Sequence, residues 1–204
     1  MINVLTYEAK EKEELNEKIC FELKCDLTDL LIKYDFIEGK LFKAQKYIAT
    51  VIKKEDVNNL INEVIKTIGK GMNIVIDTEI LSTDDIFNVT LVSNNNSILI
   101  GREGKILNSL QNLVRQIVRN KTSMNLKINL DVSNYKMKKM KNIEKIVREV
   151  AEEVKSSKVT ASLDPMNSYE RRFVHTIISE YPELETESIG EGLERHITIK
   201  YKEI

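Results

Sequence analysis

Residues 97–110 read Ser97-Ile-Leu-Ile-Gly101-Arg102-Glu103-Gly104-Lys105-Ile-Leu-Asn-Ser-Leu110. Two glycines stand three positions apart with charged residues between them, and a strongly amphipathic segment follows at once. Glycine lets a backbone approach a phosphate chain without a Cβ in the way, and the first amides of a helix attract anions. We therefore expect this loop, its two cations and the helical amides after it to hold phosphate groups.

The residues on either side of the loop alternate between helical and strand patterns. The segment after the loop has one apolar helical face, made of Ile106, Leu107, Leu110, Leu113, Val114, Ile117 and Val118. A half-buried strand is predicted beyond it, with apolar positions at Leu126, Ile128, Leu130 and Val132. Upstream, we expect strands at 74–76 and 87–91, and a helix over 57–68 that stops at Gly69.

This order of elements resembles the type II KH fold over about residues 56–133. A KH module clamps single-stranded RNA or DNA with a Gly-x-x-Gly loop. Taken alone, such a tetrapeptide is often an ordinary turn, and Glu103 either projects into solvent or weakens the clamp. Apolar walls for the bases would be Ile98, Ile100 and Ile106. The resemblance implies RNA contacts at Ile100, Gly101, Arg102, Glu103, Gly104 and Lys105.

Residues 1–55 predict a separate β-α-β-β unit, with strands at 3–7, 32–36 and 47–52 and a helix at 10–25. This layout resembles the N-terminal domain of the Jag family of bacterial proteins. The turn would be Glu38-Gly39-Lys40-Leu41-Phe42. The family usually has Lys-Lys-Gly-Phe-Leu-Gly there, and the second glycine is missing here. The conformation of this turn, and any partner that it contacts, is therefore left open.

The C-terminal segment begins with a predicted long helix over 135–155. Asn167 and Glu170 then have capping-box spacing, so a second helix should start there. Arg171 and His175 lie four residues apart on that helix. Alone, such a pair is more often a simple surface contact, but within Pro165-Met-Asn-Ser-Tyr-Glu-Arg-Arg-Phe-Val-His175 it resembles the R-3-H domain. That resemblance implies RNA contacts at Arg171, Arg172 and His175.

The whole chain therefore resembles the Jag family. The fold class implied is α+β, with three small domains: an N-terminal unit at 1–55, a type II KH domain at 56–134, and a connecting helix with an R-3-H domain at 135–204. The family implies a single-stranded RNA-binding protein, a post-transcriptional regulator linked to cell elongation, division and cell-wall synthesis. It also implies a small single-KH partner protein. Single-stranded DNA as ligand, a homodimer, and peripheral association with membrane-insertion machinery stay open, as does an adaptor role through KH–KH pairing.

The distribution of charge supports an anionic ligand better than its total does. The 204 residues have a net charge of −1, but Asn96–Thr160 holds 14 cations against 6 anions, an excess of +8. Such a surplus next to the loop favours phosphate binding. The lysines over 136–145 fit a solvated helix face equally well.

Composition argues against an enzyme and against cofactors. The only histidines are His175 and His196. Neither a Ser or Cys nucleophile motif nor the Gly-x-x-x-x-Gly-Lys-Ser/Thr loop of nucleoside triphosphatases is present. Glu185, Glu187 and Glu191 fit a solvated loop better than a cation site. Cys20 and Cys25 are expected to be reduced structural thiols. Since no signal-peptide pattern and no apolar run of about 20 residues occurs, we expect a cytoplasmic protein.

Overall fold

The computed structural model describes residues 2–38 and 45–202. The chain divides into two compact units, Met1–Ser133 and Asn134–Ile204, and each is described by itself. Both units combine helices with small, mostly antiparallel sheets, so the predicted α+β class is confirmed. Among the described helices, no segment is long and apolar enough to cross a membrane.

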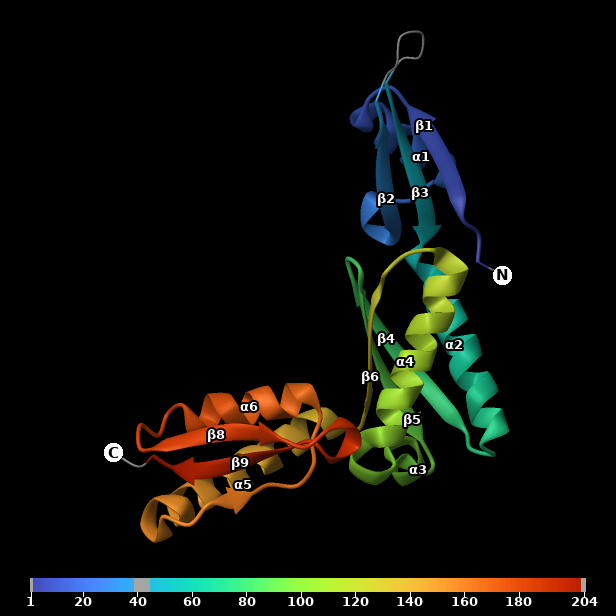
Figure 1. Ribbon diagram of the computed structural model, residues 1–204. Coiled ribbons are helices and arrows are strands. Elements are labelled where there is room, and N and C mark those ends of the chain that lie inside the picture. The colour runs from blue at the N-terminus through green and yellow to red at the C-terminus, as the bar shows by residue number, and fades with distance from the viewer. Residues whose placement is uncertain (1, 39–44, 203–204) are drawn as a thin grey trace. The chain divides into compact units, whose positions relative to one another are not determined.

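The first unit starts with the predicted β-α-β-β layout (Figure 1). Its elements are β1 (Leu5–Ala9), α1 (Lys12–Leu23), a 3₁₀ turn (Leu27–Asp29), β2 (Leu30–Ile37) and β3 (Lys46–Lys53). The antiparallel sheet has the order β1-β3-β2. Leu15 and Ile19, one helical turn apart, are buried against Ala49 and Val51 of the central strand. The predicted turn over 38–42 falls largely outside the described residues.

The same unit continues with the helix and strand order expected of a type II KH fold. The elements are α2 (Lys54–Gly71), β4 (Ile76–Thr83), β5 (Ile86–Ser93), α3 (Asn96–Ile100), α4 (Lys105–Thr122) and β6 (Lys127–Val132). β5 is central, antiparallel to β4 and parallel to β6. Helices α2 and α4 lie side by side and contact the two edge strands (Figure 1).

The KH core follows the alternating pattern of the sequence, with one displaced strand. Apolar residues of β5 and β6 that face the helices are fully buried: Phe87, Val89, Leu91, Ile128, Leu130 and Val132. Our prediction of a strand over 74–76 is wrong for its first two residues. The Ile74 amide instead donates a hydrogen bond to the Gly69 carbonyl at the end of α2, at 2.9 Å. Val75 is 67% exposed, and the strand begins only at Ile76.

The outer edge of β6 is covered by side chains of α4. The amide of Leu130 donates to Gln111 Oε1 at 3.0 Å, and Arg115 Nε donates to the carbonyl of Ile128 at 2.6 Å. Arg115 also bonds the side chain of Asn129. These two polar residues of an otherwise core-packing helix therefore satisfy backbone groups that β5 does not reach.

The second unit packs two helices against a three-stranded sheet (Figure 1). Its elements are α5 (Tyr135–Ser157), β7 (Ala161–Ser162), α6 (Ser168–Ile178), β8 (Leu184–Ile189), a 3₁₀ turn (Gly192–Glu194) and β9 (His196–Tyr201). The sheet order is β7-β9-β8, and both pairs are antiparallel. The core holds Val147, Ala151, Val154, Val174, Ile177, Ile178, Leu184, Ile197 and Ile199.

Candidate nucleic-acid interface

The glycine loop is a sharp break between two helices of the KH fold. Helix α3 ends at Ile100, and Gly101 adopts φ 68° and ψ −178°. Residues 102–104 form a single 3₁₀ turn, in which Glu103 is left-handed at φ 55°. Gly104 has φ 81°, and α4 starts at Lys105. The backbone thus departs from helical geometry at Gly101, Glu103 and Gly104. Arg102 and Glu103 are both exposed in this turn.

Gly101 is required both by its backbone and by its neighbour. The φ and ψ combination of Gly101 is strongly disfavoured for any residue that has a Cβ. The Cβ of an alanine would also lie 2.5 Å from Cγ1 of Ile106, whose side chain packs over the glycine. The close approach of Ile106 thus fixes the first turn of α4 against the end of α3.

We expect Gly101→Ala to destabilise the protein by about 1–3 kcal/mol, because the new side chain would hold a strained φ and displace Ile106. Urea unfolding measures this change. Gly71→Ala is the matched control: its Cβ would meet nothing within 4 Å, at the end of helix α2. That variant should be neutral or slightly stabilised. Equal stability of the two variants would contradict the role given to Gly101.

The loop contains an anion between its two cations. Arg102 has a side chain that is 86% exposed, and its Nε lies 3.6 Å from Glu103 Oε1. Lys105 Nζ lies 3.9 Å from the other oxygen of Glu103. Ion pairs this long and this exposed contribute little to stability. Arg102 and Lys105 therefore flank Glu103 at the surface of the loop.

Several backbone amides of the loop already have acceptors. The Gly101 amide donates to Ser97 O at 2.9 Å, and the Gly104 amide to Gly101 O at 3.3 Å. The amide of Lys105 donates to the carbonyl of Arg102. Our expectation that the first helical amides are available to an anion is thus wrong for Gly104 and Lys105. Both amides donate within the 3₁₀ turn and are therefore not available to an anion.

Apolar side chains reach the surface on both sides of the loop. Ile98 and Ile106 each keep 40% of their surface exposed, whereas Leu99 between Ile98 and Ile100 is fully buried. Ile100 is half-buried. The three predicted groove walls thus lie on the two helices that flank the loop, where unstacked bases could contact them.

The second set of predicted residues lies on α6, in the other unit. The capping box is present as predicted: Asn167 Oδ1 accepts from Glu170 N, and Glu170 Oε2 accepts from Asn167 N, both at 3.0 Å. Arg171 Nη1 donates to the Met166 carbonyl at 2.8 Å, so this guanidinium holds the preceding loop in place. One nitrogen of the predicted site residue Arg171 is therefore used in a structural hydrogen bond.

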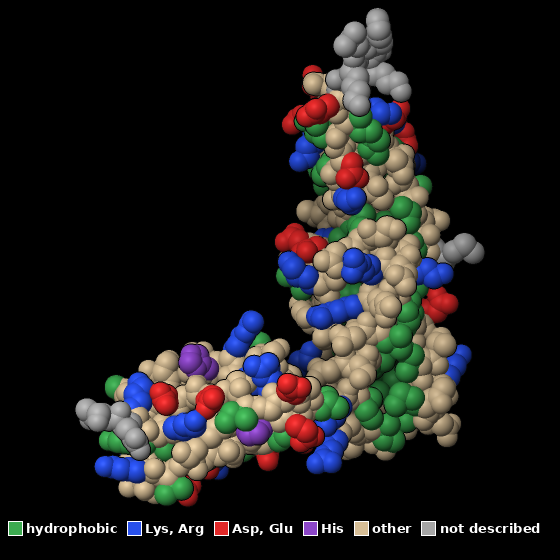
Figure 2. Space-filling view, viewed as in Figure 1, with side chains coloured by type: hydrophobic (Ala, Val, Ile, Leu, Met, Phe, Trp, Pro, Cys, Tyr) green, Lys and Arg blue, Asp and Glu red, His purple; other side chains and the backbone are tan. Residues whose placement is uncertain are grey.

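The other two predicted residues of α6 are exposed. Arg172 lies on the outer side of the helix, one position from the anchored Arg171. His175 Nδ1 lies 2.7 Å from Thr186 Oγ1 on β8, and this contact orients the ring. In Figure 2, His side chains lie on the visible face of this unit, among Lys, Arg and acidic side chains. Cationic and hydrogen-bonding groups are thus presented together here.

The lysine cluster over 136–145 includes a structural residue. Lys139 Nζ lies 2.6 Å from Glu170 Oε1, and the two side chains are only 23% and 6% exposed. This ion pair joins α5 to the start of α6. Lys145 pairs more loosely with Glu149, 3.8 Å away on its own helix. The cluster therefore combines an internal contact with solvated positions.

One of the acidic residues near the C-terminus is paired with a cation. Glu187 bonds Lys200 across β8 and β9, and this contact raises the pKa of Lys200. Across residues 2–38 and 45–202, no cluster of three or more His, Cys, Asp or Glu side chains is placed to hold a metal ion.

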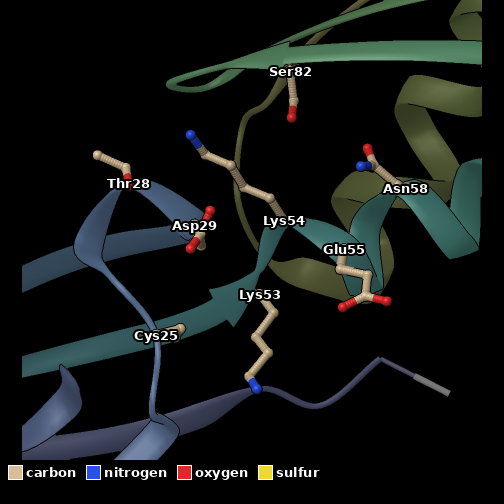
Figure 3. Close-up of a pocket in the computed structure, with 8 residues that line it drawn as sticks. All are labelled: Cys25, Thr28, Asp29, Lys53, Lys54, Glu55, Asn58 and Ser82. Carbon is tan, nitrogen blue, oxygen red and sulfur yellow. The ribbon is translucent and has the colours of Figure 1, made fainter. Parts of the chain in front are cut away.

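The described structure also has a polar pocket where β3 meets α2 (Figure 3). The side chain of Lys54 extends toward Thr28 and Ser82, whereas Lys53 points the other way (Figure 3). The lining residues are Cys25, Thr28, Asp29, Lys53, Lys54, Glu55, Asn58 and Ser82. Two lysines are matched by two carboxylates, so the pocket lacks the cationic excess of a phosphate site. Burial raises the pKa of the Cys25 thiol, and both cysteines are unpaired.

Sequence reasoning missed three features of this interface. The Lys139–Glu170 ion pair and the Arg171 anchor join residues through tertiary contacts that no local spacing reveals. Tyr169, which is 69% exposed on α6, was also passed over. The sequence alone could have indicated Tyr169, because this aromatic residue lies three positions before Arg172 on a predicted helix.

Two domain families match the chain at these places. Residues 58–132 match the KH domain of KhpA/KhpB, and residues 141–201 match the R-3-H domain. The fold and the two sites therefore define a protein that joins a KH domain to an R-3-H domain.

Curated relatives extend the similarity over the whole chain. RNA-binding protein KhpB of Clostridium symbiosum is 32% identical over 208 residues, which cover 98% of this chain and 93% of that protein. RNA-binding protein KhpB of Bacillus subtilis is 24% identical over 164 residues, 79% of each chain. The Streptococcus pneumoniae protein of the same name is 24% identical over 85% of this chain and 49% of its own length. The chain belongs to the KhpB (Jag) family, as its resemblance predicted.

Proposed function

We propose that this protein binds single-stranded RNA without transforming it, through the glycine loop of the KH domain and through α6 of the R-3-H domain. The observation that carries this proposal is the loop itself: an exposed turn with the cations Arg102 and Lys105 on either side of Glu103. The names of the relatives, RNA-binding protein KhpB, support the same ligand.

At the loop, side chains make most of the contacts with the RNA. Gly101 sets the sharp turn at the start of the loop, while the exposed cations Arg102 and Lys105 bind phosphates. The exposed faces of Ile98 and Ile106 offer apolar contact to unstacked bases. Neutralising about three phosphates of a single strand gives a slope of about −2 for log affinity against log salt. One such module binds only modestly.

A second contact on the same chain raises the affinity through effective concentration. Arg172 and His175 are the exposed groups of α6 that would supply it. A guanidinium can hold a phosphate with two hydrogen bonds or stack on a base, and an imidazole can stack or donate. Arg171 supports them by fixing the loop before the helix.

The family resemblance sets the finer proposal. We infer a cytoplasmic post-transcriptional regulator linked to cell elongation, division and cell-wall synthesis, without enzymatic activity, cofactor or metal ion. Its partners would include a small single-KH protein, and peripheral contact with membrane-insertion machinery is a further candidate. The net charge of −1 limits non-specific attraction to nucleic acid, so binding should depend on these two local sites.

The direct test is fluorescence anisotropy with labelled oligouridylate, in a series of salt concentrations. We expect binding that falls with salt at a slope of about −2 per engaged KH module. Oligodeoxythymidylate run in parallel separates RNA from DNA. Affinity that does not change with salt would contradict a phosphate clamp, and the absence of any binding would contradict the function.

Pairing with another KH-containing chain is a second candidate, favoured by apolar surface on α4. Leu113 is 45% exposed although it belongs to the apolar face of the helix. Figure 2 shows hydrophobic side chains at the surface over the region of α2 and α4. Such a face suits a homodimer or a small single-KH partner. An adaptor of this kind would co-purify with protein and without nuclease-sensitive material.

A further inference from the structure

Tyr169 is an exposed aromatic residue on a rigid part of the second unit. Its side chain is 69% exposed, whereas Phe173, Tyr181 and Tyr201 of the same unit pack against the core. Its backbone is fixed, since its amide donates to Asn167 Oδ1 at 2.9 Å within the capping box. The next residue, Glu170, is buried and paired with Lys139. The ring is therefore presented to solvent from a well-held first turn of α6.

Arg172 lies on the same side of the helix as Tyr169. Residues three apart on a helix have Cβ atoms about 5–6 Å from each other. Arg171 is anchored to the Met166 carbonyl, so the exposed guanidinium next to the ring is that of Arg172. A flat aromatic face and a cation at this separation match the two parts of one nucleotide, the base and its phosphate.

We propose that Tyr169 is the base-stacking platform of the α6 contact, and that Arg172 binds the phosphate of the stacked nucleotide. The ligand is an unpaired nucleobase within a single strand. Stacking on an aromatic ring is tolerant of sequence, because every base has a π face. The site therefore adds affinity rather than a strict preference for one base. This inference rests on the proposed RNA-binding function and assigns it a further residue.

The experiment uses the absence of tryptophan from the chain. Tyr169→Trp introduces a single fluorophore at the site, and stacking of a base on the indole quenches its emission. Phe21→Trp is the matched control, because Phe21 is 85% exposed on α1, in the other unit. With oligouridylate added to the full-length protein, we expect quenching for Tyr169→Trp and unchanged emission for Phe21→Trp.

Affinity measured by anisotropy completes the test. Tyr169→Ala should weaken binding about tenfold, and Tyr169→Phe should keep the native affinity because the ring remains. If the Tyr169 hydroxyl instead had a structural role, Tyr169→Ala and Tyr169→Phe would weaken RNA binding equally. RNA binding by anisotropy without quenching of Tyr169→Trp would overturn the stacking role while leaving the proposed function standing. No RNA binding by the native protein would overturn both.

Discussion

Replacing Arg102 and Glu103 together by aspartate is expected to reduce the affinity for oligouridylate about 100-fold and to leave the unfolding curve unchanged. A hydrogen bond to a charged group contributes roughly 1.5–3 kcal/mol, and each 1.4 kcal/mol is a factor of about ten. The double variant loses the Arg102 contact and adds a repulsive carboxylate at the same point. The loop would then carry two acidic side chains against Lys105 alone.

The fold should tolerate this change. Both side chains are exposed, and their ion pairs of 3.6 and 3.9 Å contribute little. Residue 103 has a φ of 55°, a region that aspartate enters more easily than glutamate. The backbone hydrogen bonds of the turn, which the amides of Gly101 and Gly104 donate, do not involve these two side chains.

A matched control separates the loop from simple net charge. Lys66→Asp makes the same change of two charge units at an exposed position of α2. Its affinity should stay within about threefold of the native value, as expected of an exposed, salt-screened charge outside the loop. If both variants lose binding equally, RNA is attracted by overall charge and the loop has no special part.

The largest expected effect on stability comes from Lys139→Met. Glu170 is only 6% exposed and would lose its cation, although the Asn167 amide would still bond its other oxygen. Breaking a buried ion pair costs about 3–5 kcal/mol; since Lys139 is partly exposed, we expect a loss of about 2–3 kcal/mol. The double variant Lys139→Met/Glu170→Gln should recover part of this loss, because glutamine carries no unpaired charge.

The two histidines allow the unfolding of the second unit to be followed separately from that of the first. His175 and His196 both lie in the unit Asn134–Ile204, so their imidazole resonances report the unfolding of that unit during a urea titration. Lys138→Met is the control, because it removes the same charge from an exposed neighbouring position. A midpoint for Lys139→Met no lower than that of Lys138→Met would show that the buried pair stabilises nothing.

Local patterns predicted most of the fold. The alternation of Phe87, Val89 and Leu91 and the helical spacing after Lys105 reflect burial on one face, which sequence periodicity records directly. The capping box at Asn167 was equally readable, because both of its bonds lie within four residues. These features depend on neighbours in the chain.

The site was less predictable, since its chemistry depends on contacts between distant residues. Residue types alone suggested that Arg171 and Arg172 were equivalent, but the carbonyl of Met166 occupies only the first. The same holds for the lysines of α5, because the sequence does not reveal that Lys139 pairs with the buried Glu170. At the loop, donation from the Gly104 and Lys105 amides to nearby carbonyls could not be inferred from the glycine spacing.

The cover that α4 places on β6 has a consequence for how the protein behaves at high concentration. An uncovered edge strand is a template on which further chains add β-structure and aggregate. Arg115 and Gln111 occupy the Ile128 carbonyl and the Leu130 amide, so an incoming strand finds those positions taken. The helix that follows the glycine loop therefore also hinders strand addition at the β6 edge of the KH sheet.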